Sequence, residues 1–134
     1  MHSLIDSSLW IDFTRARSPQ ALKLAISTHI LSPQAALAEP VMYEVLRHAT
    51  EREVVMIEAQ FKTMPCLPTP DDLWPAAAKL GQRCRKRGIN AGSLDLLIVT
   101  VALHNDAEVI TFDRDFETIG LTCNLRVKLL HRPR

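Results

Sequence analysis

Glycine, cysteine pairs and histidine clusters are scarce in this chain. Only 4 of the 134 residues are glycine, which argues against an all-β protein built from many tight turns. The three cysteines are odd in number and lack CxxC spacing, so we interpret them as small buried hydrophobic residues in a reducing cytoplasm. The five histidines show no HxxxH spacing, so nothing in the sequence supports a histidine zinc site.

An excess of charge is also lacking. The formal net charge is +1, from 16 basic and 15 acidic residues, whereas a protein that coats nucleic acid is usually far more basic. Any RNA would therefore have to be held by a local basic patch or a bound metal. The longest apolar stretch, Leu94–Leu103, is too short to span a bilayer and contains Asp95. With no signal peptide visible, we expect a cytoplasmic protein without a membrane partner.

The remaining composition is that of a globular chain. Hydrophobic residues make up 47% and charged residues 23%, and 134 residues suffice for one domain with a substantial core. We therefore expect a single domain over residues 1–134.

Short apolar runs alternate with amphipathic segments along the whole chain. Strands are predicted at 3–5, 35–38, 109–112 and 127–130, with a weaker candidate at 66–67. Helices are predicted at 9–15, 19–30, 40–48, 51–62, 71–87 and 94–104. Alternation of this kind requires parallel pairing through crossover connections. The predicted fold class is α/β, a three-layer α/β/α arrangement with a central parallel sheet.

Several details of these helices follow from single residues. Ser7 and Ser8 are expected to cap the first helix, and Ser93 the helix over 94–104. In the second helix, Leu22, Leu24, Ala25 and Ile26 are expected to point inward. In the fifth, Leu73, Ala77, Leu80 and Cys84 share one face, and Gly88 ends the helix.

Four acidic residues occupy special places in this arrangement. Asp6 and Asp113 end the strands at 3–5 and 109–112. Glu44 and Asp95 are expected in the first turns of helices that follow strands and so begin near the same edge. Because ligands of open parallel sheets bind beyond the carboxyl ends of the strands, we expect the four side chains to converge there.

Convergence of carboxylates needs compensation. Two like charges about 4 Å apart repel by about 4 kcal/mol at an effective dielectric constant near 20. Hard oxygen ligands select Mg²⁺ or Mn²⁺ as the neutralising ion, and such a site suits phosphodiester hydrolysis. Each acid also has a purely structural interpretation: Asp6 as a helix cap, Glu44 as a solvated residue, Asp95 as a partner of the helix dipole, and Asp113 and Asp115 as turn residues.

Four segments together resemble a known family. They are Leu4–Trp10 (LIDSSLW), Pro40–Leu46 (PVMYEVL), Gly88–Ile89 followed by Ser93–Ile98 (SLDLLI), and Thr111–Phe116 (TFDRDF). In this order the chain resembles the PIN-domain family, and more narrowly the VapC-type toxin ribonucleases of type II toxin–antitoxin systems. The resemblance covers essentially the whole chain.

The resemblance implies a Mg²⁺- or Mn²⁺-dependent endoribonuclease, an RNA substrate, a cognate antitoxin and a homodimer. By position, Asp6, Glu44, Asp95 and Asp113 correspond to the catalytic, metal-binding acids, with Asp115 and Thr111 as accessory residues. From its place beside the acids, Arg114 is a candidate contact to the scissile phosphate. The basic run Arg83, Arg85, Lys86 and Arg87 could hold the RNA backbone, although cations at a helix C-terminus are favoured by the helix dipole anyway.

Other interpretations remain open. The main alternative is a catalytically inactive PIN-like binding or scaffold protein, which would be free to lose the acids that are present here. A receiver domain needs paired acids after its first strand, and a haloacid dehalogenase phosphatase needs DxD; Asp6-Ser7-Ser8 provides neither. Trp10, Phe13, Met56 and Phe61 could line a groove for an apolar antitoxin helix, but core packing is the preferred interpretation. Residues 131–134 are interpreted as a solvated end.

Overall fold

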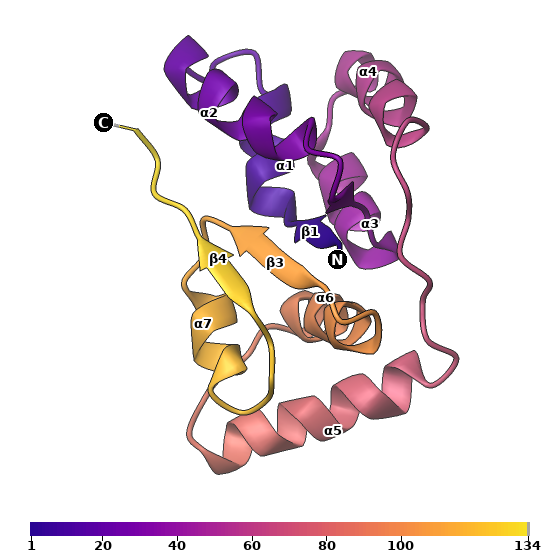
Figure 1. The fold of residues 1–134 in the computed structure, drawn as a ribbon, viewed down its shortest axis with the longest axis vertical. Coiled ribbons are helices and arrows are strands. Elements are labelled where there is room, and N and C mark those ends of the chain that lie inside the picture. Colours follow the sequence, from indigo (N-terminus) through magenta and orange to yellow (C-terminus); the bar gives the residue numbers. More distant parts are fainter. Residues whose placement is uncertain (134) are drawn as a thin grey trace.

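The sheet is parallel throughout and has four strands. The computed structural model describes residues 1–133, so Arg134 lies outside the described residues. Within that range the strand order is β2-β1-β3-β4. The strands are β1 (Ser3–Ile5), β2 (Ala35–Ala36), β3 (Glu108–Thr111) and β4 (Val127–Leu129). This sheet with its flanking helices confirms the predicted α/β/α fold class (Figure 1).

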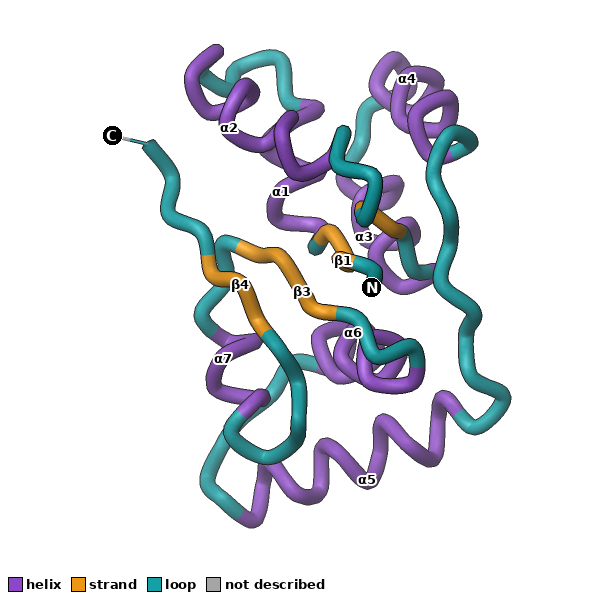
Figure 2. The backbone as a smooth tube through the Cα atoms, viewed as in Figure 1, coloured by secondary structure: helices purple, strands orange, loops and turns teal. Residues whose placement is uncertain are grey.

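Helices cover both sides of the sheet. They are α1 (Ser7–Thr14), α2 (Gln20–Ile30), α3 (Glu39–His48), α4 (Glu51–Phe61), α5 (Leu73–Lys86), α6 (Ser93–His104) and α7 (Asp115–Gly120). In Figure 1, α1 to α4 gather on one side of the central strands and α5 to α7 on the other. Figure 2 shows long loop segments leading into and out of α5. Among the described residues, no helix is both long and apolar enough to cross a membrane.

The pairing of β1 with β3 determines where the chain presents its acids. Ile5 is aligned with Ile110, and the Asp6 backbone N–H donates to the Ile110 carbonyl at 3.0 Å. Both strands therefore end at the same level, and the residues that follow them enter one edge of the sheet. This register is the link between the fold and the candidate site.

The structure corrects several predicted boundaries. The second strand ends at Ala36, and Leu37 forms only an isolated parallel bridge with Cys66, which is what remains of the short strand predicted at 66–67. Gly92, not Ser93, is the N-cap of α6. The cap of α1 is Asp6, whose carboxylate accepts from the Ser8 backbone, so the prediction of a serine cap was wrong. The short helix α7 was not predicted, because six residues are too few for a clear periodicity.

The core confirms one predicted helix face and corrects another. Leu73, Ala77, Leu80 and Cys84 of α5 are all buried, and Gly88 follows the helix with a φ of 74°. In α2, however, Leu24 is 59% exposed and Ala25 is also exposed. Helix α2 lies at the periphery (Figure 1), so only the positions spaced by four residues, Leu22, Ile26 and Ile30, reach the core.

The cysteines differ from one another in burial. Cys84 is buried, Cys123 is half-buried and Cys66 is exposed, and all three are free thiols. The interpretation as buried hydrophobic residues therefore holds for Cys84 and is wrong for Cys66.

Candidate functional site

Asp6 is the most deeply buried acid of the candidate site. It lies between β1 and α1, and its side chain accepts hydrogen bonds from Thr111 Oγ1 at 2.7 Å and from Ser8 Oγ at 2.8 Å, both on Oδ2. Burial raises the pKa of Asp6, and these hydrogen bonds act in the opposite direction by stabilising the charged form. Asp6 is therefore both the cap of α1 and a member of the acidic cluster.

Thr111 connects the end of β3 to Asp6. Its hydroxyl donates to Asp6 and accepts from the Asp113 backbone N–H at 2.9 Å. The neighbouring Phe112 backbone N–H donates to Ser8 Oγ at 3.2 Å. The residues after β3 are thus fastened to the start of α1 by hydroxyl groups, and this network sets the direction in which Asp113 leaves the sheet.

Three further acids meet beside Asp6. Asp95 lies in the first turn of α6, Asp113 follows β3, and Asp115 begins α7. Each offers a carboxylate oxygen, and these three oxygens lie within 4.8 Å of one another. The Asp115 backbone N–H donates to Asp113 Oδ1 at 2.9 Å. Asp115, predicted as an accessory residue, belongs to this group together with Asp95 and Asp113, whereas Asp6 and Glu44 are not among its members.

The electrostatic strain of the cluster is concentrated on Asp95. Burial, followed by the charges of Asp6, Asp113, Glu44 and Asp115, raises the pKa of Asp95 to about 7. All four neighbours named here are acidic, and each raises the pKa of Asp95.

Glu44 reaches the cluster from a different turn than expected. It lies in the second turn of α3, not the first, because the helix already begins at Glu39. The Ser7 hydroxyl donates to Glu44 Oε1 and lies 3.3 Å from Asp6 Oδ1. Ser7 therefore bridges the two carboxylates, and the sequence analysis did not identify it.

The donor set fits a hard divalent cation. The available ligands are carboxylate oxygens, no histidine or thiolate stands among them, and a raised pKa shows that the acids are destabilised in their charged forms. A divalent ion would remove that penalty and would be held by the ligand type that Mg²⁺ and Mn²⁺ prefer.

The predicted basic residues lie in two separate places, one beside the acids and one at the end of α5. Arg114 is the exposed N-cap residue of α7, directly after Asp113. Arg83, Arg85 and Lys86 are exposed in the last turn of α5. Arg87 donates to the Leu121 carbonyl and so joins α5 to the end of α7. A role for these residues in RNA binding stays a prediction.

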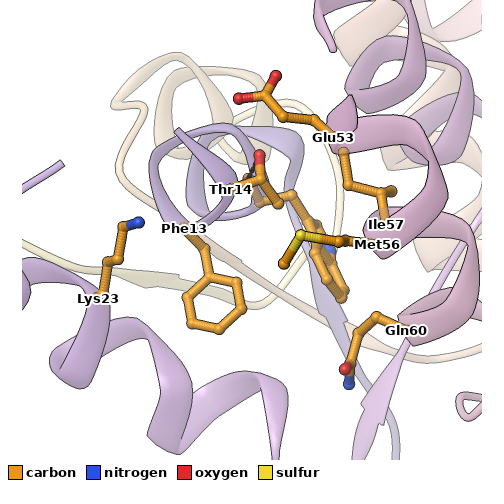
Figure 3. Close-up of a pocket in the computed structure, with 8 residues that line it drawn as sticks. Phe13, Thr14, Lys23, Glu53, Met56, Ile57 and Gln60 are labelled. Atoms are coloured by element: carbon orange, nitrogen blue, oxygen red, sulfur yellow. Dashed lines mark hydrogen bonds between the residues drawn. The ribbon is translucent and has the colours of Figure 1, made fainter. Parts of the chain in front are cut away.

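A separate apolar cleft lies between α1, α2 and α4. It has a volume of about 160 Å³ and is lined by Trp10, Phe13, Thr14, Lys23, Glu53, Met56, Ile57 and Gln60. Figure 3 shows Phe13 and Met56 pointing into the space between the helices. The preference for core packing is right for Trp10 and Phe61, which are buried in a T-shaped pair, and wrong for Met56, which is 75% exposed.

Residues 131–133 are exposed, as predicted for a solvated end, but Arg132 makes specific contacts with the domain, and Arg134 lies outside the described residues. Arg132 Nε donates to Asp12 Oδ2 at 2.7 Å, and its guanidinium carbon lies 4.5 Å from the centre of the Phe112 ring. Sequence patterns could not reveal this contact, because its partners are 120 residues apart and neither carries a motif.

The chain is similar to one described family over most of its length. The PIN domain family matches residues 3–121. Among curated proteins, ribonuclease VapC11 from Mycobacterium tuberculosis is 29% identical over 129 residues, which cover 92% of this chain and 95% of that protein.

Solved structures share the fold. VapBC2 from Rickettsia felis, bound to a promoter DNA fragment, has a TM-score of 0.77 at 13% identity and covers 98% of this chain and 100% of its own. DNA-bound VapBC from Salmonella typhimurium has a TM-score of 0.74 at 15% identity, covering 96% and 97%. At these identities the likeness extends to the fold alone.

The raised pKa of Asp95 predicts how stability changes with pH. That pKa, about 7, lies above the ordinary value of 3.8, so between these pH values the folded state binds more protons than the unfolded state. The contribution of Asp95 to the free energy of unfolding therefore becomes less favourable as pH rises toward 7. In EDTA, Asp95→Asn should raise the free energy of unfolding by about 2 kcal/mol at pH 7.5, allowing for solvent screening.

At pH 5 the gain from Asp95→Asn should be less than half as large, because the native carboxyl is then protonated. Urea unfolding of both proteins at the two pH values measures the difference. An equal effect at both, or a loss of stability at pH 7.5, would contradict the assignment of electrostatic strain to Asp95.

Proposed function

This chain belongs to the PIN-domain family, and on that basis we propose that it is a Mg²⁺- or Mn²⁺-dependent endoribonuclease acting as the toxin of a toxin–antitoxin pair. One observation carries the proposal: five acids, two just after β1 and β3 and the others on α3, α6 and α7, gather at the edge where β1 and β3 end. The acids are Asp6, Glu44, Asp95, Asp113 and Asp115. The similarity to a protein named as a ribonuclease supports the choice of RNA as the substrate.

We assign the metal ion to Asp6, Glu44, Asp95 and Asp113. The Oδ2 atom of Asp6 accepts from Thr111 and Ser8, whereas Oδ1 has only the longer 3.3 Å contact with Ser7, so we assign Oδ1 to the ion. Asp115 either adds a ligand or orients Asp113. Its backbone N–H already donates a hydrogen bond to the Asp113 carboxylate. A bound divalent ion lowers the pKa of water and stabilises negative charge on phosphate oxygens.

The protein's own groups handle protons and position the RNA. Glu44, which accepts from the Ser7 hydroxyl, is proposed either to position the metal or to help remove a proton from the attacking water. Thr111 keeps Asp6 and Asp113 in one orientation through its two hydrogen bonds. Arg114 is the proposed contact to the scissile phosphate, and the basic run at the end of α5 is a more distant contact to the RNA backbone.

For the antitoxin we propose the cleft between α1, α2 and α4. An amphipathic helix can insert its apolar side chains among Phe13, Met56 and Ile57, while Lys23 and Glu53 provide polar contacts at the rim. The similar solved structures, VapBC2 from Rickettsia felis and VapBC from Salmonella typhimurium, support a protein partner of this kind. A homodimer stays a prediction. Exposed Tyr43 and Trp74 are large side chains available for it.

RNA cleavage tests the proposed function. A panel of structured RNAs should be cut with Mg²⁺ or Mn²⁺ and not with EDTA, and Asp95→Asn and Asp113→Asn should each lower the rate at least about a hundredfold. The matched control is Asp71→Asn, an exposed acid before α5. Asp6→Asn should also abolish cutting but removes a helix cap as well.

Full activity of Asp95→Asn or Asp113→Asn would contradict the proposed site. If no RNA is cut under any condition and calorimetry detects no Mn²⁺ binding, the inactive scaffold becomes the better description.

Substitution in the cleft tests the antitoxin surface. Met56→Lys places a charge among apolar side chains, so co-purification with the cognate antitoxin should be lost. Val55→Lys is the control, because Val55 is 71% exposed on the same helix and does not line the cleft. RNA cleavage by both variants should stay unchanged. If both variants lose antitoxin binding equally, or if both bind the antitoxin normally, the interface lies elsewhere.

A further inference from the structure

The C-terminal tail begins at the acidic edge of the sheet. After β4, the Leu130 backbone N–H donates to the Thr111 carbonyl at 2.8 Å, and the hydroxyl of the same threonine holds Asp6. Figure 1 shows the tail continuing from β4 toward α1 and α2. Residues 130–133, which we call the tail, are therefore carried past the edge where the acids converge.

Arg132 is the anchored residue of this tail. Its ion pair with Asp12 of α1 uses Nε, and the Asp12 side chain is only 15% exposed. Its guanidinium also lies over the Phe112 ring, one residue before Asp113. An ion pair and a cation–π contact together fix the orientation of a side chain that would otherwise be mobile.

This anchoring leaves part of the guanidinium available. The Arg132 side chain is 51% exposed, and within residues 1–133 its recorded hydrogen bond involves Nε alone. The two Nη groups can donate to a planar or tetrahedral anion while Nε stays on Asp12. Arg132 is tied to the acidic edge through its contact with Phe112, which directly precedes Asp113 in the chain.

An acidic edge that receives RNA needs a fixed positive charge nearby. The phosphate backbone is repelled by the acids and is attracted by each cation that it can reach. We propose that Arg132 binds a backbone phosphate of RNA lying across the acidic edge, next to the phosphate that is cleaved. This inference rests on the proposed ribonuclease function and adds to it a substrate-binding residue from the tail.

RNA binding by a cleavage-deficient protein tests the proposal. In an Asp95→Asn background with Mg²⁺, fluorescence anisotropy of a labelled 20-nucleotide single-stranded RNA of mixed sequence is measured over a series of salt concentrations. Arg132→Ala should weaken binding about three- to tenfold and lower the slope of log K against log salt by about 0.7, the value for one lost phosphate contact on a single strand.

The chain offers a closely matched control. Arg126 pairs with Asp106 at 3.0 Å and is 46% exposed, but it precedes β4 and so lies at the opposite edge of the sheet. Arg126→Ala removes the same charge and the same kind of ion pair, and it should leave both affinity and salt slope unchanged. Equal effects of Arg132→Ala and Arg126→Ala would overturn the proposal, because only net charge would then matter.

Two further variants separate binding from tail anchoring. Arg132→Lys keeps the positive charge and should retain most of the salt slope. Asp12→Asn removes the charge of Asp12 and releases the anchor but keeps the charge of Arg132, so it should weaken RNA binding less than Arg132→Ala does. If Asp12→Asn reproduces the full loss of affinity, Arg132 acts by holding the tail and the proposal is wrong. If wild type cuts RNA and Arg132→Ala binds normally, only this proposal fails. If wild type neither cuts nor binds RNA, both it and the proposed function fail.

Discussion

Carboxylates brought together in a half-buried place repel one another, and much of this fold serves to hold them there. The alignment of β1 with β3 brings Asp6 and Asp113 to one edge. The Thr111 hydroxyl then joins them through one hydrogen bond given and one accepted. The cost appears in the raised pKa of Asp95. A site that stays destabilised until a cation arrives is suited to binding one tightly.

Helix α1 connects the features on which the proposals depend. Its N-terminus is capped by Asp6. One part of its surface, Trp10 and Phe13, lines the apolar cleft. Asp12, on another part, anchors Arg132 of the tail. A partner helix in the cleft would therefore pack against the same eight-residue helix that positions the metal-binding edge. The acidic site and the cleft remain distinct surfaces, since none of the five acids lines the cleft.

The sequence was most informative where the signal was local and repeated. Parallel strands followed from their alternation with helices, and the buried face of α5 from its spacing of three and four residues. The predicted burial of side chains was wrong where tertiary contacts determine it. Leu24 of α2, for example, is exposed because the helix lies at the periphery. The helix that begins at Asp115 was not predicted, because α7 is too short to show a periodicity. Ser7 and Arg132 act through partners 37 and 120 residues away, which no pattern in the chain reveals.

Crystals grown with Mn²⁺ would test the central claim, that these carboxylates form a divalent metal site. Anomalous scattering at the manganese edge locates the ion independently of any activity. The account predicts a strong peak within coordinating distance of Asp95 and Asp113, facing Asp6 Oδ1, and its disappearance in Asp95→Asn crystals. A peak elsewhere on the protein, or none at saturating Mn²⁺, would contradict it.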